Sequence, residues 1–416
     1  MRIKLINKLN DHLNECKIKY FFLLKKSKNS HDGDIDVYIN FKNFYHLRKL
    51  IKKFLDKNNF ILHHIIQYEF NSYSFVICSR KKNNVKFFNL DICNYYIFNG
   101  KKIFSFTGLK SEKNLSLQKI KNLNNEDLFI YYLLKSFAKK KFDLNRFNYL
   151  KKEFLKLNFK RLEYFFGLKD FLKLKNIFLS SSNLKFKKEF NYFRLKYIKN
   201  KKTLFIKELI RNFKRACYPV GLCIGIIGVD GSGKSTIINQ LVDKLSPKYD
   251  ESAFKKILLY HLFNPKNNKS KNITPYNKQP YGIFLSFIKI IYLYIRFIHM
   301  YYFSILPNKI KGQLIIVDRN HYDVMIDPIR YRVGRFNVFL QFIFKFIPKP
   351  DFTIFLNVKP DLLFKRKKEL KINQIKSLVK KYNSYTNKMH NIKKINNNIN
   401  YDFSINKILD LILKNK

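Results

Sequence analysis

The sequence predicts an α/β protein whose C-terminal part is a doubly wound parallel sheet, preceded by an α+β domain and a helical connector. Three observations support this. After residue 220, short apolar runs rich in β-branched residues alternate with helical patterns, as in βαβ units. A glycine-rich loop joins the first of these runs to a helix. Strand and helix patterns are mixed before residue 120 and purely helical after it. We therefore expect domains at 1–120, 121–215 and 216–416.

The composition limits the functional classes. A chain of 416 residues with 46% hydrophobic residues can form two or three domains with large cores. Lys and Arg number 83 against 29 Asp and Glu, which gives a formal net charge of +54. That charge fits a nucleic-acid or anionic-membrane partner. However, the lysines are scattered and the abundance of Lys, Asn, Ile, Phe and Tyr is that of an AT-rich genome, so we do not expect a nucleic-acid partner.

The cysteines and the first residues bear on the cellular compartment. The five cysteines form no C-x-x-C pair and no His/Cys cluster with zinc spacing, which indicates free thiols in a reducing compartment. Residues 1–17 contain no continuous apolar segment, so we expect no signal peptide and a cytoplasmic location.

The first domain carries a pattern of carboxylates. Its periodicities predict helices and strands in the order helix 1–15, strand 20–24, strand 34–39, helix 41–57, and strands 61–66, 74–78 and 85–92. Alternation places Asp34 and Asp36, in Gly33-Asp34-Ile35-Asp36, on one face of a strand. Asp91 lies in a later strand. Neighbouring carboxylates repel each other unless a cation joins them, so the pattern suits Mg²⁺. A solvated D-x-D at a strand start is the alternative.

This pattern resembles the minimal nucleotidyltransferases of the DNA polymerase β superfamily, in which a D-x-D after a glycine and a third aspartate bind two metals. The resemblance implies that Asp34, Asp36 and Asp91 are metal ligands. The family's usual Gly-Ser before the D-x-D is replaced here by Leu24-Lys-Lys-Ser-Lys-Asn29. In the family the Gly-Ser holds the nucleoside triphosphate, so its replacement argues against catalysis by this domain.

The middle of the chain, residues 125–215, is predicted to be helical. An apolar face follows Asn125, and further helices are predicted at 145–160, 161–174 and 184–212. Pro219 and Gly221 mark a boundary near residue 215.

The most informative motif lies in residues 221–242. The apolar run Cys223–Ile227 leads into Gly228-Val-Asp-Gly-Ser-Gly-Lys-Ser235, which fits G-x-x-x-x-G-K-[ST], and a helical pattern follows. In such a loop, backbone N–H groups and a helix N-terminus bind phosphate, the Lys reaches the β- and γ-phosphates and the Ser hydroxyl binds Mg²⁺. The expected binding residues are Gly228, Asp230, Gly231, Ser232, Gly233, Lys234, Ser235 and Thr236.

The remaining C-terminal elements extend this unit. We predict strands and helices at, in order, strand 256–262, helix 281–306, and strands 313–318, 352–358 and 399–403, before a final helix 405–414. An apolar strand that ends in Asp318 is what a phosphate-binding enzyme uses to hold Mg²⁺ opposite the serine. Arg319 follows at the edge of the sheet where ligands collect.

The helix predicted at 281–306 is long enough to span a bilayer. Lys289 and Arg296 interrupt it and share one face, with His299 close by. We therefore expect a mostly buried helix with one cationic stripe, because charges in mid-membrane are costly. Peripheral membrane contact and homodimer formation stay open.

Residues 220–416 resemble the thymidylate kinase family of P-loop nucleoside monophosphate kinases. The loop Gly228–Thr236 matches the family's P-loop, including the unusual Asp230, and Val317-Asp318-Arg319 matches its DR motif. Pro350–Pro360 matches its P-D-L-x-x-x-L-D-V-x-P strand, with Asn357 in place of the common Asp. The resemblance implies transfer of the γ-phosphoryl group of ATP to a nucleoside 5′-monophosphate, with Mg²⁺.

The resemblance also implies individual roles. Lys234, Ser235 and Asp318 would serve ATP and Mg²⁺, Arg319 would hold the acceptor phosphate, and Asp230 would contact the acceptor's sugar hydroxyl. Arg366 would close over the phosphoryl group in transfer, although a solvated helix face is the alternative for this arginine. Each role fits a reaction in which positioning and charge neutralisation dominate.

The acceptor motifs depart from those of thymidylate kinases. His321-Tyr-Asp323 and Asp327-Pro-Ile-Arg330-Tyr-Arg332 stand in their place. On an extended loop Arg330 and Arg332 would point the same way and, with Arg319, Lys289 and Arg296, would line an acceptor pocket for a nucleotide or another phosphorylated small molecule. The layout of the whole chain is similar to uncharacterised two-part bacterial proteins, some of them associated with surface polysaccharides.

Two other functions stay open at the level of sequence. The first is a nucleotidyltransferase whose P-loop half is regulatory. The second is a basic protein that binds nucleic acid or a membrane surface without turnover.

Overall fold

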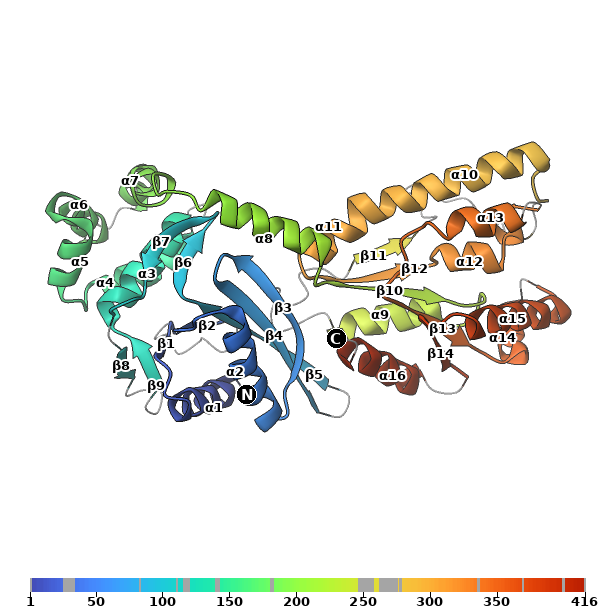
Figure 1. The fold of residues 1–416 in the computed structure, drawn as a ribbon, viewed down its shortest axis with the longest axis horizontal. Helices are drawn as coiled ribbons and strands as arrows, with labels where there is room; N and C mark the ends of the chain where they lie inside the picture. Colours follow the sequence, from blue (N-terminus) through green and yellow to red (C-terminus); the bar gives the residue numbers. More distant parts are fainter. Residues whose placement is uncertain are drawn as a thin grey trace. The chain divides into compact units, whose positions relative to one another are not determined.

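The computed structural model of the chain describes residues 2–24, 34–81, 84–109, 111–114, 120–138, 143–179, 183–245, 258–261, 276, 279–334, 337–368, 370–398 and 401–414. The chain divides into two compact units (Figure 1). Unit 1 comprises residues 1–79 and 88–214, and unit 2 comprises residues 80–87 and 215–416. The three-domain division with boundaries at 120 and 215 stays a prediction.

Unit 1 is built on a seven-stranded sheet of mixed parallel and antiparallel pairs, in the order β3-β4-β5-β2-β1-β9-β8. Its strands are β1 (Tyr20–Phe22), β2 (Ile35–Ile39), β3 (Ile61–Glu69), β4 (Ser72–Lys81), β5 (Asn84–Cys93), β8 (Ser111–Asn114) and β9 (Ile120–Leu123). The apolar faces of α1 (Arg2–Glu15) and α2 (Phe44–Lys57) share one core with this sheet. The predicted α+β architecture is therefore present.

The sequence prediction missed four strands of unit 1. β6 (Tyr95–Phe98) and β7 (Lys101–Ser105) form a separate hairpin, and β8 and β9 complete the large sheet. The hairpin turn is Asn99-Gly100, and both residues have positive φ (49° and 71°). Asn-Gly between two strand-like runs is the strongest short-range hairpin signal, so β6 and β7 were detectable in the sequence.

The helical part of unit 1 breaks more often than predicted. Its helices are α3 (Asn125–Ala138), α4 (Leu144–Phe154), α5 (Phe159–Phe166), α6 (Leu168–Leu179), α7 (Asn183–Arg194), the π-helical turn η2 (Leu195–Lys199) and α8 (Phe205–Cys217). Asn158 caps α5 by accepting from Lys160 N, and Gly167 ends it with φ 77°. Apolar periodicity alone predicts longer helices here, and these capping residues are what ends and restarts them.

Unit 2 contains a five-stranded sheet in which every pair is parallel. Its order, β11-β12-β10-β13-β14, places the second, third, first, fourth and fifth strands of this sheet, counted along the chain, side by side. The strands are β10 (Leu222–Ile227), β11 (Leu258–His261), β12 (Leu314–Asp318), β13 (Phe352–Asn357) and β14 (Ile392–Asn396). The predicted parallel sheet is confirmed.

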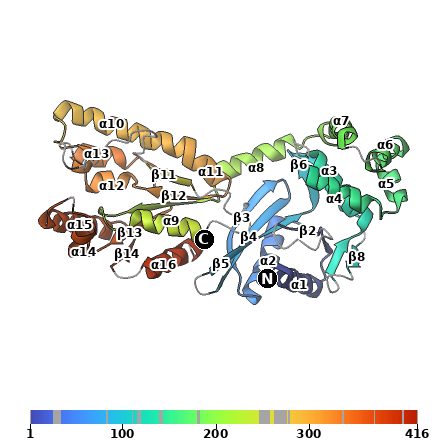
Figure 2. The same ribbon diagram turned by 180° about the vertical axis from the view of Figure 1, so that it is seen from behind.

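Helices cover both faces of this sheet (Figures 1 and 2). α9 (Lys234–Leu245) and α16 (Tyr401–Lys414) lie on one face, while α10 (Ile283–Met300), α12 (His321–Ile326) and α13 (Asn337–Phe344) lie on the other. α14 (Pro360–Arg366) and α15 (Ile372–Asn387) follow β13.

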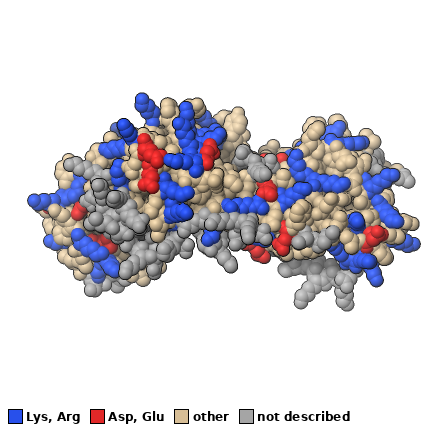
Figure 3. All heavy atoms as spheres, turned by 90° about the horizontal axis from the view of Figure 1, so that it is seen from below, with Lys and Arg blue, Asp and Glu red and all other residues tan. Residues whose placement is uncertain are grey.

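Lys and Arg side chains are spread among neutral residues over the face of the molecule drawn in Figure 3.

The last strand is not where the sequence predicts it. The prediction placed it at 399–403, but β14 is Ile392–Asn396 and α16 begins at Tyr401. β14 lies at the edge of the sheet and buries only Ile392 and Ile395, while the lysines between them are exposed. Two apolar residues in a run of Lys and Asn give a weak strand signal, and lysine on an edge strand is a common protection against aggregation.

The long apolar helix of unit 2 is also different from the expectation. α10 continues through the π-helical turn η4 (Tyr301–Ile305) into α11 (Leu306–Ile310). Ser286, Ile290, Leu293 and Phe297 on one face of α10 are buried. However, only 22% of the most apolar stretch of this helix is buried, so the expectation of a mostly buried helix is wrong. Within the described ranges, Ile283–Ile310 is the single helix long and apolar enough to cross a membrane.

Gly225 in the middle of β10 allows a close crossing of side chains. A Cβ atom there would lie 2.8 Å from Thr353 Oγ1 and still closer to Asn320 Nδ2. The Asn320 amide crosses the strand at this point and donates to Thr353 Oγ1 at 3.2 Å. Asn320 also caps α12, by accepting from Tyr322 N at 2.9 Å.

We expect Gly225→Ala to destabilise unit 2 by about 1–3 kcal/mol, the usual cost of overpacking a core. Thermal and urea unfolding of the full chain would measure the loss. Gly282→Ala is the matched control, since a Cβ at this helix cap of α10 meets nothing within 4 Å; its cost should stay below about 1 kcal/mol. Equal stability of the two variants would contradict the crossing at Gly225.

Candidate functional site

The candidate site lies at the carboxyl ends of β10 and β12. The two strands are parallel neighbours, and Ile226 of β10 pairs with Asp318 at the end of β12. The loop that follows β10 and the Asp318-Arg319 turn therefore leave the sheet at the same edge. The winding of a doubly wound sheet reverses between such strands, and ligands bind in the crevice that this reversal creates.

The glycine-rich loop between β10 and α9 is shaped by backbone conformations that favour glycine. Gly231 and Gly233 have φ of 84° and 86°. A Cβ on Gly233 would lie 2.8 Å from Tyr401 Cε1. Asn397, which is 1% exposed, donates to Ser232 O at 2.8 Å and accepts from Ser404 Oγ. The segment that follows β14 thus holds the loop in place.

Lys234 begins α9 and is buried under the loop. Its Nζ donates to Gly228 O at 2.6 Å and to Val229 O at 3.1 Å, and it lies 3.9 Å from Asp230 Oδ1. Burial lowers the pKa of Lys234 and outweighs the opposing effect of the Asp230 charge. Ser235, the next residue, is exposed at the helix N-terminus, where backbone N–H groups favour an anion.

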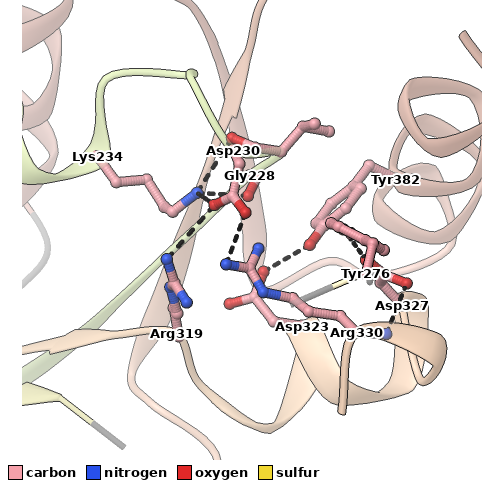
Figure 4. Close-up of polar contacts among 10 residues, drawn as sticks. Gly228, Asp230, Lys234, Tyr276, Arg319, Asp323, Asp327, Arg330 and Tyr382 are labelled. Atoms are coloured by element: carbon pink, nitrogen blue, oxygen red, sulfur yellow. Dashed lines mark hydrogen bonds and ion pairs between the residues drawn. The ribbon is translucent and has the colours of Figure 1, made fainter. Parts of the chain in front are cut away.

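Three cations converge on the carboxylate of Asp230 (Figure 4). Besides Lys234, Arg330 Nη2 lies 2.6 Å from Asp230 Oδ2, and Arg319 Nη2 lies 3.4 Å from Oδ1. Burial acts to raise the pKa of Asp230, but the charges of Lys234, Arg330 and Arg319 prevail, and the pKa lies below its ordinary value. The cluster therefore holds one ammonium and two guanidinium groups around a single carboxylate, and such groups are the donors that bind phosphate.

The turn that carries Arg319 is conformationally strained. Arg319 has φ 59°, the left-handed region that non-glycine residues rarely adopt, and its N donates to Ile226 O at 3.3 Å. Such conformations persist where the surrounding structure holds them, and they cluster at functional sites. The Asn320 amide, fixed over Gly225, is the neighbouring contact that holds this turn.

Two buried carboxylates lie beside the cluster, in the segments that stand in place of the acceptor motifs, but no role was predicted for either of them. Asp323 accepts from Tyr382 Oη at 2.7 Å, and its Oδ2 has no hydrogen-bond partner among the described residues. Burial raises the pKa of Asp323 to about 6 against the opposing charge of Lys234.

The second carboxylate, Asp327, accepts from Tyr276 Oη at 2.5 Å and from Arg330 N. Carboxylates in an apolar helical turn directly after the Asp-Arg pair were the available signal.

The structure does not bring Arg332 and Arg366 to the cluster. Arg332 stacks on the Tyr281 ring at 3.8 Å and donates to Tyr281 Oη and Gln279 O. Arg366 is exposed at the end of α14, above the Tyr401 ring. The expectation that Arg330 and Arg332 point the same way is therefore wrong.

The two charges of α10 also lie away from the cluster. Arg296 donates to Tyr292 Oη at 2.9 Å, and Lys289 Nζ lies 5.0 Å from the centre of the Tyr292 ring. These contacts lie on α10 itself, and neither of them brings the two side chains to Asp230.

The carboxylates of unit 1 do come together. Asp36 and Asp91 are paired in register on β2 and β5, and Asn89 Nδ2 donates to Asp34 Oδ1 at 2.9 Å. Lys135 Nζ, from α3, lies 2.9 Å from Asp36 Oδ2. Burial, and then the charges of Asp34 and Asp36, raise the pKa of Asp91 to about 8.

These three carboxylates do not match the expected metal site. Within the described part of the chain, no three His, Cys, Asp or Glu side chains are grouped so that they could hold a metal ion. The Lys135 ammonium supplies positive charge beside Asp36 instead. Gly33 and the segment 25–33, on which the nucleotidyltransferase resemblance also depends, lie outside the described residues.

Comparison with known proteins supports the resemblance of unit 2 to thymidylate kinases, but not the resemblance proposed for unit 1. Residues 226–408 match the family model of thymidylate kinase, which supports a nucleotide kinase function for this region. The nucleotidyltransferase resemblance of unit 1 receives no such support. No curated protein matches the chain.

Among solved structures, thymidylate kinase from Candida albicans is 21% identical with a TM-score of 0.34, covering 47% of this chain and 92% of its own. Thymidylate kinase from Ehrlichia chaffeensis is 17% identical with a TM-score of 0.33, covering 47% and 99%. At these scores the two likenesses carry no argument about substrate or mechanism.

Asp323 should make stability depend on pH with a definite sign. Its pKa is raised from 3.8 to about 6 in the folded protein, so the folded state holds the proton more tightly than the unfolded state. The stability is therefore greatest below pH 4 for this group and falls by up to about 3 kcal/mol as pH rises through 6. Asp323→Asn keeps an acceptor for Tyr382 and should remove this loss.

Urea unfolding of the wild type and of Asp323→Asn at a series of pH values would measure the difference. We expect the variant to gain stability relative to the wild type between pH 4 and pH 7. Parallel curves for the two proteins would show that burial of this carboxylate has no such cost.

Proposed function

We propose that unit 2 is an ATP- and Mg²⁺-dependent kinase that transfers the γ-phosphoryl group to a nucleoside monophosphate or a related phosphorylated small molecule. The observation that carries the proposal is the convergence of Lys234, Arg319 and Arg330 on Asp230 beside the glycine-rich loop. The match of residues 226–408 to the thymidylate kinase family model supports the same reaction class.

The residues at the end of β10 suit a nucleoside triphosphate. The positive-φ glycines Gly231 and Gly233 turn the loop backbone around the N-terminus of α9, where N–H groups can donate to phosphate oxygens. Lys234 is already held beside this loop by Gly228 O and Val229 O. Its ammonium can exchange those carbonyls for the more strongly binding oxygens of a phosphate.

Mg²⁺ would be held by the hydroxyl of Ser235 and, directly or through water, by Asp318. Both residues lie at the carboxyl edge of the sheet, because Asp318 ends β12 and Ser235 lies in the first turn of α9. A hard cation prefers such oxygen ligands. When bound, it neutralises charge on the phosphate oxygens during transfer.

The two arginines suit the phosphate of an acceptor. Guanidinium groups present several donors in a plane and bind phosphate with defined geometry. Arg319 and Arg330 come from different elements, the turn after β12 and the short helix η5 (Ile329–Tyr331), and meet at Asp230. Phosphoryl transfer needs this positioning and charge neutralisation more than it needs a nucleophilic side chain.

The reaction is tested with purified full-length protein, ATP, Mg²⁺ and a panel of acceptors that includes nucleoside monophosphates, nucleosides and phosphorylated sugars. Lys234→Ala should lower acceptor-stimulated ADP formation on the order of 100-fold or more, because a preorganised charge contact to the reacting phosphates is lost. Lys244→Ala is the matched control, since Lys244 lies on the same helix and pairs with Asp402 at the surface. If no acceptor stimulates turnover, or if Lys234→Ala turns over normally, the proposal is wrong.

A second pair of variants tests the acceptor contact. Arg330→Met should raise the KM for the acceptor by roughly 10- to 100-fold, which is what a charge-assisted hydrogen bond of about 1.5–3 kcal/mol supplies. Arg332→Met is the matched control, because Arg332 stacks on Tyr281 two residues along the chain. Its KM for the acceptor should stay near that of the wild type. Thermal unfolding checks that both variants are folded, and equal KM changes would contradict the assignment.

A further inference from the structure

The outward face of α10 and η4 is apolar and exposed. We define this docking face by the side chains that lie opposite the buried side of the helix and are about half exposed or more: Phe284, Ile288, Tyr292, Ile295, Tyr302 and Phe303. They recur over more than four turns, and α10 runs along the outer side of unit 2 (Figure 1). A stripe of this length on one exposed helix marks an interaction site more strongly than scattered apolar residues do.

The neighbouring helix extends the apolar surface. α13 packs against α10 through stacked rings of Phe287 and Phe339, 5.0 Å apart. On and just beyond α13, Val338, Phe342 and Phe346 are 58–85% exposed. Two adjacent helices of unit 2 therefore present large apolar side chains to solvent.

The charged side chains of the two segments that carry the docking face are all Lys or Arg. Residues 279–317 and 328–350, which carry α10 and α13, contain no Asp or Glu. Lys289 and Arg296 are seven residues apart and therefore lie on the same flank of α10. Their contacts with Tyr292 place both charges at the border of the apolar stripe. Long cationic side chains at such a border can reach lipid headgroups while their stems cover apolar surface.

The packing of α10 disfavours a spanning arrangement. Ile290, Leu293 and Phe297 on its inner face share one core with Val324 of α12 and Leu340 of α13. A helix that crossed a bilayer would have to leave this core and carry Lys289 and Arg296 into the hydrocarbon. A helix that stays packed and lies in the plane of a membrane surface loses neither its core nor the hydration of its charges.

The charge pattern also disfavours a second copy of the chain as the occupant. A twofold dimer brings the same patch of both copies together. The cationic flanks would then approach each other with no carboxylate on α10 or α13 to pair with them, and like charges at an interface are costly. A protein partner would also need hydrogen-bonding groups that this face scarcely offers, whereas a lipid surface requires few.

We propose that the docking face binds the surface of an anionic phospholipid membrane and holds unit 2 there as a peripheral protein. The apolar side chains enter the boundary between headgroups and acyl chains, while Lys289 and Arg296 contact the anionic headgroups. This inference is independent of the phosphoryl acceptor.

The test is co-sedimentation of the full-length protein with vesicles of phosphatidylcholine mixed with phosphatidylglycerol, and with vesicles of phosphatidylcholine alone. We expect binding to the anionic vesicles that weakens as salt is raised. Ile288→Gln combined with Ile295→Gln should lower the binding constant at least about tenfold, because buried apolar area is lost. Lys289→Gln combined with Arg296→Gln should lower it by about 25-fold, about fivefold for each charge at the surface.

Matched controls separate this face from the general positive charge of the chain. Phe403→Gln removes an exposed aromatic from α16, on the other face of the sheet. Lys376→Gln combined with Lys380→Gln removes two exposed charges from α15. Both controls should bind nearly as the wild type does, and thermal unfolding confirms that all variants are folded.

Three outcomes would overturn the proposal. The first is no binding to anionic vesicles, and the second is binding that the α10 variants and the controls change equally. The third is a homodimer, seen by light scattering, that Ile288→Gln with Ile295→Gln dissociates; a second copy would then cover the face.

Discussion

The ion pairs of Asp230 are the interactions on which the site depends. Lys234 follows β10, Arg319 follows β12, and Arg330 lies in η5, so three separate segments present cations to one carboxylate. Without that carboxylate the cations would repel one another in a partly buried site, and the cost of burying them would be uncompensated. The parallel register of Ile226 with Asp318 is what brings the first two segments together. The register of the sheet thus positions the cationic side chains, and the charge of Asp230 reduces the repulsion between them.

The balance between burial and nearby cations also explains why the pKa values of Asp323 and Asp230 are shifted in opposite directions. Both carboxylates are buried near the same cations, but Asp230 contacts them directly, whereas Asp323 accepts from the neutral Tyr382. Burial therefore prevails at Asp323 and raises its pKa, while the cations prevail at Asp230 and lower it. A phosphate that enters the cluster brings negative charge toward Asp323 and favours its protonated form further.

The sequence predicted the parts of the candidate site that consist of contiguous residues. The loop from Gly228 to Thr236 and the pair Asp318-Arg319 are local motifs, and the structure places both at the same edge of the sheet. Predictions failed where they depended on backbone detail or on distant contacts. Arg330 and Arg332 separate because η5 turns between them and Arg332 adopts φ 62°. Lys135 reaches Asp36 across 99 residues of sequence, and no local pattern can indicate such a pairing.

The helix α10 shows the same limit and also connects the two surfaces of unit 2. Its periodicity predicts which side chains share a face, but not how much of the circumference the core will cover. The inner face of α10 packs against Val324 and Tyr331, the sequence neighbours of Asp323 and Arg330. One layer of packed side chains therefore separates the outer face of α10 from the sequence neighbours of Arg330. If the docking face binds a membrane as proposed, the helix held there packs through its inner face on the same core as the residues beside Arg330.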